Sequence, residues 1–161
     1  DQREKWPSSA EQLMQVYPYD KKIEVQILGG AQTPYEVLRQ LPENWKVYEF
    51  GEMNPKEFLE EIDVFVYFTH DDLVEAFGRV IIEAMASGIP VIVPHRFNKT
   101  FKDSVIYAKP EEVKDKLFEL MNNKDYYFKC VEKARDFVEK NFGFPMHIKR
   151  LNLGRRVFYD N

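Results

Sequence analysis

Strand-like and helix-like segments alternate along the chain, and this alternation predicts an α/β fold built from parallel strands. The strand-like segments at residues 63–68 and 89–94 are apolar without polar alternation, as expected for strands that are covered on both faces. Because crossovers between parallel strands are right-handed, the expected architecture is a Rossmann-like, doubly wound parallel sheet. There is no internal repeat and no obvious linker, so we expect a single domain.

The individual elements follow from hydrophobic period and from capping residues. The expected strands are residues 22–30, 45–51, 63–68, 89–94 and 105–108. The expected helices are residues 34–42, 54–62, 75–87, 110–121 and 124–141, with a polar loop at 95–104 and a last helix at 145–159. Asn54 as N-cap and Pro55 at the first helical position favour a helix start there. Ser87 and Gly88 are expected to end the helix that precedes them.

The composition is that of a soluble globular domain, because 44% of the 161 residues are apolar and 31% are charged. The net charge of -4 argues against a general affinity for nucleic acid or acidic membranes. The single cysteine, Cys130, excludes an internal disulfide framework and favours a reducing, cytoplasmic compartment. No apolar run approaches the ~20 residues of a membrane span, although peripheral membrane attachment of a full-length protein stays open. The first residue is not methionine, so we expect a processed chain or a fragment of a longer one.

Ligands of open α/β sheets bind outside the carboxyl ends of the strands, often at helix N-termini. The expected rim consists of residues 29–30, 51–53, 68–78 and 94–98. His70 on this rim is either a polar ligand contact or an ordinary loop histidine. Asp71 and Asp72 beside it lack a spaced fourth ligand, so we expect no metal site. Arg96 or Lys99 is expected to supply positive charge, unless that loop does not touch the ligand.

The expected helix at residues 75–87 is apolar over most of its circumference and carries one narrow charged stripe. The stripe contains Glu75, Arg79 and Glu83 at spacings of four residues, which favours a simple ladder of surface ion pairs. The alternative is a ligand site, because the helix follows a buried strand and its N-terminus is expected on the rim. Gly78 would let the backbone approach a ligand there, and the carboxylates could accept hydrogen bonds from sugar hydroxyls.

The sequence around this helix, EAFGRVIIEAMASGIPVIV, closely resembles the E-x7-E signature in the C-terminal domain of retaining GT-B glycosyltransferases, the glycosyltransferase family 4 group. DVFVYFTHDDL is similar to the strand and loop before that signature, and VYEFGEMNPKEFLEEI to the family's strand, glycine turn and short helix. The resemblance covers nearly the whole chain. It implies that residues 1–161 form the nucleotide-sugar-binding C-terminal half of a GT-B fold.

The resemblance also implies roles for individual residues. Glu75 would contact the donor sugar, and Glu83 would accept hydrogen bonds from the ribose of the nucleotide. DQREKWP resembles the segment after the family's first strand, so Lys5 would match a lysine that neutralises the leaving diphosphate. The family's arginine would lie just before the first residue, and Arg3 is out of register with it. Glu75 and Lys5 are therefore the expected catalytic residues.

Further donor contacts are implied at the helix tip and in one turn. Backbone N–H groups of Phe77 and Gly78 would meet sugar or phosphate, and residues 51–53 would lie near the base. Arg79 is expected to hold the two glutamates in place. Ala76 stands where the family usually has glycine, so the tip geometry is expected to differ. The expected donor-binding residues are Glu83, Phe77, Gly78, Ala76, Gly51, Met53, His70 and Arg79.

The reaction implied by the resemblance is transfer of a sugar, of hexosyl type, from a UDP- or GDP-sugar to an acceptor hydroxyl with retention of anomeric configuration. No metal or other cofactor would be obligatory. The acceptor, a glycan, lipid or small molecule, would bind an N-terminal domain that is absent from this chain, so we expect donor binding without turnover. The alternative is a non-catalytic α/β nucleotide-binding or regulatory module of the same fold, favoured by Ala76 and by the non-glycine loop after Pro94.

Overall fold

The computed structural model describes residues 2–72 and 78–146, and in this part of the chain every pairing between strands is parallel. The strands are β1 (Val25–Leu28), β2 (Trp45–Tyr48), β3 (Phe65–Val66), β4 (Val91–Val93) and β5 (Ile106–Tyr107). A helix follows each strand in the described residues, so the predicted α/β class is confirmed.

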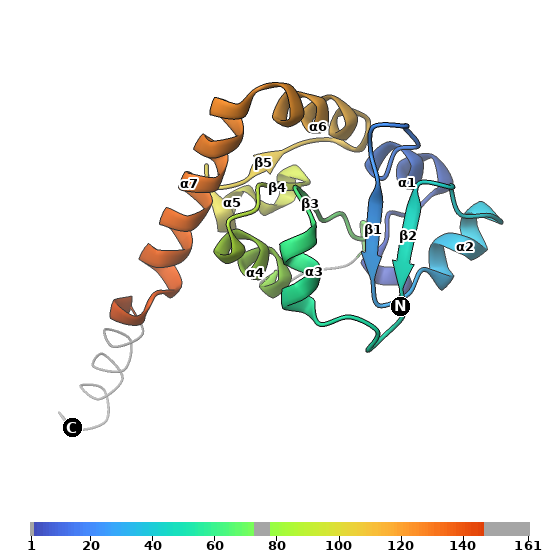
Figure 1. Cartoon of the computed structure of the whole chain (residues 1–161), viewed down its shortest axis with the longest axis horizontal. Coiled ribbons are helices and arrows are strands. Elements are labelled where there is room, and N and C mark those ends of the chain that lie inside the picture. The colour runs from blue at the N-terminus through green and yellow to red at the C-terminus, as the bar shows by residue number, and fades with distance from the viewer. Residues whose placement is uncertain (1, 73–77, 147–161) are drawn as a thin grey trace.

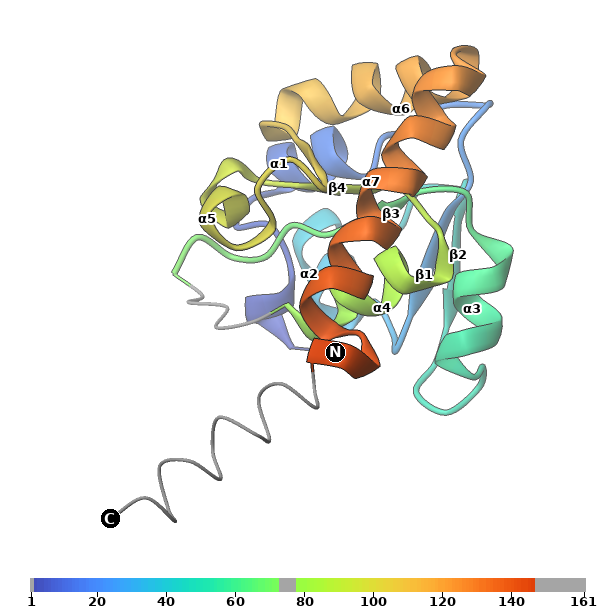
Figure 2. The ribbon, with the colours of Figure 1, turned by 90° about the vertical axis from the view of Figure 1, so that its left-hand side faces the viewer.

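Helices flank the strands on both sides. In the described residues they are α1 (Ala10–Val16), α2 (Gln32–Leu38), α3 (Pro55–Glu61), α4 (Arg79–Ser87), α5 (Asn98–Phe101), α6 (Val113–Asn122) and α7 (Lys124–Phe142). Short 3-10 helices are η1 (Arg3–Lys5), η2 (His95–Phe97) and η3 (Pro110–Glu112). In Figure 1, α1 and α2 flank the β1–β2 pair, and α7 runs along the outside of the other strands. Figure 2 shows α7 passing over α4, which it contacts, with α6 beyond one end of α7.

The described strands form two sheets, one of β1 and β2 and the other of β3, β4 and β5 (Figure 1). Tyr17, Gln26 and Phe65 line cavities on both sides of the junction between β1 and β3. Side chains rather than a ladder of backbone hydrogen bonds therefore fill this junction. Tyr17 at the end of α1 packs against the apolar cluster that contains Phe68, which follows β3, and so links the two sides of the junction.

The central strand β4 is buried on both faces, as its apolar sequence predicted. Val91 and Val93 pack with Phe101 of α5 and with residues of α4 and α7. Ile92 points to the other face, where it packs with Val113 of α6 and with residues of α1 and β5. The two main clusters of the core therefore meet at this strand.

The N-terminal segment forms η1 and α1, for which the sequence analysis had assigned no element. Ser9 caps α1 by accepting a hydrogen bond from the N–H of Gln12 at 3.2 Å. Leu13 is fully buried, and Trp6 packs with it against Trp45 of β2. This apolar cluster fixes the start of the described chain to the first sheet.

Two predicted helix ends have the expected caps. The Asn54 side chain accepts a hydrogen bond from the N–H of Lys56 at 2.9 Å, which caps α3. Gly88 ends α4 with a φ of 80°, in the left-handed region that glycine adopts without strain. A Cβ at Gly88 would meet the guanidinium of Arg135 on α7, the mobile end of a long side chain, so a substitution there would also displace that group.

Two predicted segments differ from the structure. The helix expected at residues 75–87 begins at Arg79, because Gly78 has a φ of 64° and interrupts the helical backbone. Glu75, which the sequence analysis aligned with Glu83 on this helix, lies outside the described residues, so that alignment stays a prediction. The loop expected at residues 95–104 contains η2 and α5, since apolar side chains within it turn into the core.

The helix expected at residues 145–159 lies almost entirely outside the described part of the chain. Within that part, no helix combines the length and the apolar character needed to cross a bilayer.

We expect Phe101→Ala to lower the free energy of unfolding by about 3–5 kcal/mol, because this ring is fully buried against Phe137 of α7. Urea denaturation followed by circular dichroism measures the change. Phe128→Ala is the control, because the Phe128 ring is 55% exposed on α7 and its loss should cost less than about 1 kcal/mol. Equal losses in the two variants would contradict the assignment of Phe101 to the core.

Candidate functional site

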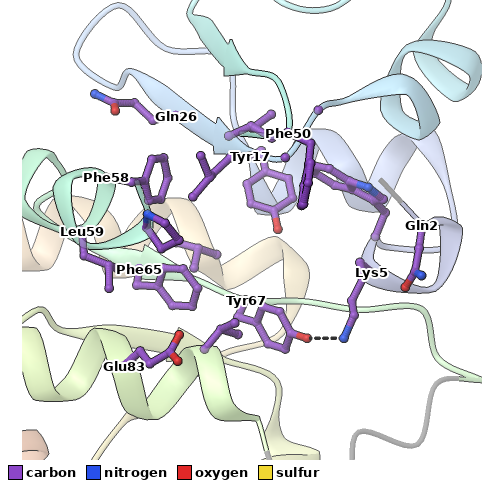
Figure 3. A pocket seen from close by; sticks show the side chains of 18 residues that line it. Gln2, Lys5, Tyr17, Gln26, Phe50, Phe58, Leu59, Phe65, Tyr67 and Glu83 are labelled. Atoms are coloured by element: carbon purple, nitrogen blue, oxygen red, sulfur yellow. Dashed lines mark hydrogen bonds between the residues drawn. The ribbon is translucent and has the colours of Figure 1, made fainter. Parts of the chain in front are cut away.

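A cavity of about 450 Å³ lies where β1, β2 and β3 end (Figure 3). Its wall includes Gly29 and Gly30 after β1, Phe50 after β2 and Tyr67 after β3. This is the carboxyl edge of the strands, where the sequence predicted ligand binding. The volume lies within the range of small-molecule sites, about 300–1,000 Å³.

Lys5 and Glu83, two of the predicted site residues, both line this cavity. Lys5 belongs to η1 and Glu83 to the second turn of α4, so the fold brings together residues that are far apart in the sequence. In Figure 3 their side chains lie at separate places on the wall, with the ring of Tyr67 between them. The Nζ atom of Lys5 donates a hydrogen bond to the hydroxyl of Tyr67 at 3.3 Å.

The segment that carries Lys5 is held on both sides of that residue. The backbone N–H of His70 donates to the carbonyl oxygen of Glu4 at 3.0 Å, and the Trp6 side chain is buried. His70 lies in the loop after β3, so this bond joins η1 to the second sheet. The position of the Lys5 ammonium therefore depends on the junction between the sheets.

Glu83 forms an ion pair with Arg79, as the spacing of four residues predicted. The Nε atom of Arg79 lies 3.1 Å from Oε1 of Glu83, and the two side chains are 83% and 45% exposed, respectively. Exposed pairs of this kind contribute little to stability, about 0–1 kcal/mol. The carboxylate of Glu83 thus lies at the cavity wall and remains accessible to a ligand.

The tip of α4 is described from Gly78 onward, where the backbone is left-handed. A Cβ on Gly78 would lie 2.9 Å from Cδ1 of Ile81, so the helix start is packed closely as well as bent. The predicted site residues Glu75, Ala76 and Phe77 lie outside the described residues. Their roles stay predictions.

Polar contacts within the loop after β3 engage several of the predicted rim residues. Nδ1 of His70 accepts a hydrogen bond from the N–H of Asp72 at 3.2 Å. The guanidinium of Arg96 donates to the carbonyl and hydroxyl oxygens of Thr69 and lies 3.6 Å from a carboxylate oxygen of Asp71. Neither His70 nor Arg96 is among the described residues that line the cavity. These contacts therefore shape the loop, and a donor contact of His70 stays a prediction.

The turn after β2 was predicted to contact the ligand through Gly51 and Met53, but it lines the cavity through neighbouring residues instead. Phe50 and Pro55 line the cavity, whereas Gly51 and Met53 between them are not among its described lining residues. The Phe50 side chain is 95% exposed, which is unusual for a ring of that size. A large apolar residue directly before Gly51 was the signal in the sequence that could have identified it.

Aromatic rings form much of the remaining wall, and the sequence analysis did not predict them. The rings of Phe65 and Tyr67 stack with centroids 6.1 Å apart, and Trp6 meets Tyr17 edge-to-face at 5.8 Å. Burial raises the pKa of Tyr17 well above its ordinary value, so its hydroxyl keeps its proton at neutral pH. Among its described lining residues, the cavity therefore combines apolar ring faces with one cation and one carboxylate.

Comparison with known proteins agrees with this geometry. The family model described as glycosyl transferases group 1 matches residues 10–137. The chain belongs to the glycosyl transferases group 1 family. A sucrose synthase from Denitrovibrio acetiphilus, a curated relative, is 31% identical to the chain over 102 residues, which cover 56% of this chain and 13% of that protein.

Two crystal structures share the fold of this group 1 chain. The structure of TarM superposes with a TM-score of 0.65 and 22% sequence identity, over 94% of this chain and 35% of TarM. A mutant of S. aureus TarM in complex with Fondaparinux, alpha-GlcNAc-glycerol and UDP gives a TM-score of 0.67 at 21% identity, over 89% of this chain and 31% of that chain. The fold is thus that of one half of a GT-B glycosyltransferase, and the chain spans about a third or less of these relatives.

We expect Gly78→Ala to lower the free energy of unfolding by about 1–2 kcal/mol or more, because alanine is strained at a φ of 64° and its Cβ meets Ile81. Urea denaturation measures this change. Ile81→Val removes the contacting Cδ1 atom, so the glycine substitution should cost less in that background. A cost that is the same in both backgrounds would argue against the contact with Ile81.

Proposed function

We propose that the full-length protein transfers a sugar from a nucleoside diphosphate sugar to an acceptor hydroxyl, and that this domain binds the donor in the cavity at the carboxyl ends of β1, β2 and β3. The observation that carries the proposal is the convergence of Lys5 and Glu83 on that one cavity. Membership of the group 1 family supports the reaction class. Retention of configuration, the hexosyl type of the sugar and a separate acceptor-binding domain are parts of the same proposal.

In this proposal Lys5 neutralises the diphosphate, whose negative charge increases as the bond to the sugar breaks. The hydrogen bond from Nζ of Lys5 to Tyr67 would orient the ammonium before the donor arrives. An ammonium has three donor positions, so a phosphate oxygen can bind to Lys5 while the contact with Tyr67 is kept. Preorganisation of this kind reduces the entropy that is lost when the donor binds.

Glu83 would accept hydrogen bonds from the ribose hydroxyls, and its ion pair with Arg79 would hold the carboxylate beside the cavity. Phe50 would cover one face of the base, because an exposed ring beside the cavity offers a stacking surface. Glu75 would contact the sugar. The backbone at Ala76, Phe77 and Gly78 would meet sugar or phosphate, as the resemblance implies.

Calorimetric titration of this chain with UDP, GDP and ADP tests donor binding. We expect saturable binding of one nucleotide, and we expect Glu83→Ala and Lys5→Ala each to weaken it about tenfold or more, since each removes a hydrogen bond to a charged group. Lys5→Ala should weaken binding of the nucleoside diphosphate far more than binding of the matching nucleoside. Lys56→Ala is the control, because that side chain pairs with Glu60 on the exposed face of α3. Absence of binding at about 1 mM of all three nucleotides would favour a non-catalytic module.

The contribution of Phe50 can be measured separately. Phe50→Ala should weaken nucleotide binding about fivefold or more, because one base stacked on a ring is worth about 1–3 kcal/mol. Phe50→Tyr keeps a stacking surface and should bind nearly as the parent chain does. If Phe50→Ala binds the nucleotide unchanged, the base lies elsewhere.

A further inference from the structure

A second cavity, of about 350 Å³, lies at the outer edge of β5, where α6 and α7 meet it. In the described part of the chain β5 has β4 as its only strand neighbour. The other edge of β5 therefore faces this cavity and the helices that line it. None of its described lining residues lines the donor cavity. The proposed function therefore makes no use of this second site.

The charged side chains that line the second cavity are mostly positive. Among the described residues they are Lys116, Lys129, Lys133 and Asp103, in a chain whose net charge is -4. Lys133 lies 3.2 Å from the carboxylate of Asp103, which is almost fully exposed, and exposed pairs are weak. Lys116 lies 2.9 Å from the carboxylate of Glu119, so Lys129 is the one cation among the described lining residues that no carboxylate pairs with. The local charge therefore favours an anion.

A buried hydroxyl at the same cavity lacks a hydrogen-bond partner in the described part of the chain. It belongs to Tyr107 of β5, which is among the lining residues. Buried polar groups normally have partners, so an unpaired one suggests that a ligand or water completes it. Burial, with a smaller contribution from the Asp103 carboxylate, raises the pKa of Tyr107 to about 12. The hydroxyl thus stays protonated at neutral pH and can donate to an anion.

We propose that this cavity binds a small molecule that carries a phosphate monoester, held by the ammonium groups of Lys129 and Lys133 and by the hydroxyl of Tyr107. A phosphate dianion accepts several charge-assisted hydrogen bonds at once, which suits donors that approach from β5 and α7. The volume is larger than a phosphate group needs, and the ring of Tyr126 offers an apolar wall for the remainder of the ligand. Binding would tie the edge strand to α7.

Calorimetric titration with glycerol 3-phosphate tests the proposal, and glycerol serves as the uncharged comparison. Lys5→Ala is the background, because it removes the cation through which a phosphate could bind the donor cavity. We expect saturable binding of glycerol 3-phosphate below about 10 mM and none of glycerol. Lys129→Ala should weaken binding at least about fivefold, since one hydrogen bond to a charged group is lost. Lys140→Ala, elsewhere on α7 and paired with Asp136, should change the affinity less than about twofold.

Tyr107→Phe separates a ligand contact from a structural role. Because the hydroxyl has no described partner, its removal should leave the urea-unfolding midpoint of the free chain unchanged or raised. The same substitution should weaken binding of glycerol 3-phosphate at least about threefold. The proposal is overturned if no phosphate binding is seen, if glycerol binds as well, or if Lys129→Ala binds like its background. Nucleotide binding at the donor cavity should be the same with and without Lys129→Ala, so this test and that of the donor site fail independently.

Discussion

Burial of β4 on both faces is the constraint on which the rest of this structure depends. Val91 and Val93 pack toward α4, α5 and α7, while Ile92 packs toward α1 and α6, so one short strand joins the two main clusters of the core. Each such side chain contributes about 1.5–3 kcal/mol when it is buried. Because Ile81 of α4 packs in the same cluster, apolar contacts fix the rotation of that helix. The accessible position of Glu83 on its outer face is a consequence of that packing.

The donor cavity depends on a different feature, the junction between the two sheets. Side chains of β1 and β3 face each other there without a described ladder of backbone hydrogen bonds, and the space they leave becomes part of the cavity. The packing of Tyr17 with the cluster of Phe68 and the hydrogen bond between His70 and Glu4 hold the two sheets together. A cation and a carboxylate at separate places on one wall suit a ligand that has an anionic part and a part rich in hydroxyl groups.

Features that depend on one turn of chain could be predicted from the sequence, and the caps at Asn54 and Gly88 are examples. The start of α4 could not be predicted, because the pattern of charged residues continues through Gly78 whereas the helical backbone conformation does not. Phe97 and Phe101 were assigned to a loop because polar neighbours hid their spacing of four residues. For the site, the family resemblance identified residues that now share a cavity, Lys5 and Glu83. It gave no sign of Phe50 or Tyr67, because their place on the wall follows from which strand ends become neighbours.

Sequence divergence in the family should be constrained where α4 ends beneath α7. The guanidinium of Arg135 occupies the space that a β-carbon at Gly88 would need. A relative with a residue larger than glycine at position 88 therefore requires a smaller or redirected side chain at position 135. The guanidinium also places a positive charge near the C-terminus of α4, where the helix dipole favours a cation. The two positions are thus expected to change together during evolution, and their covariation would record how these helices pack in chains too distant to superpose closely.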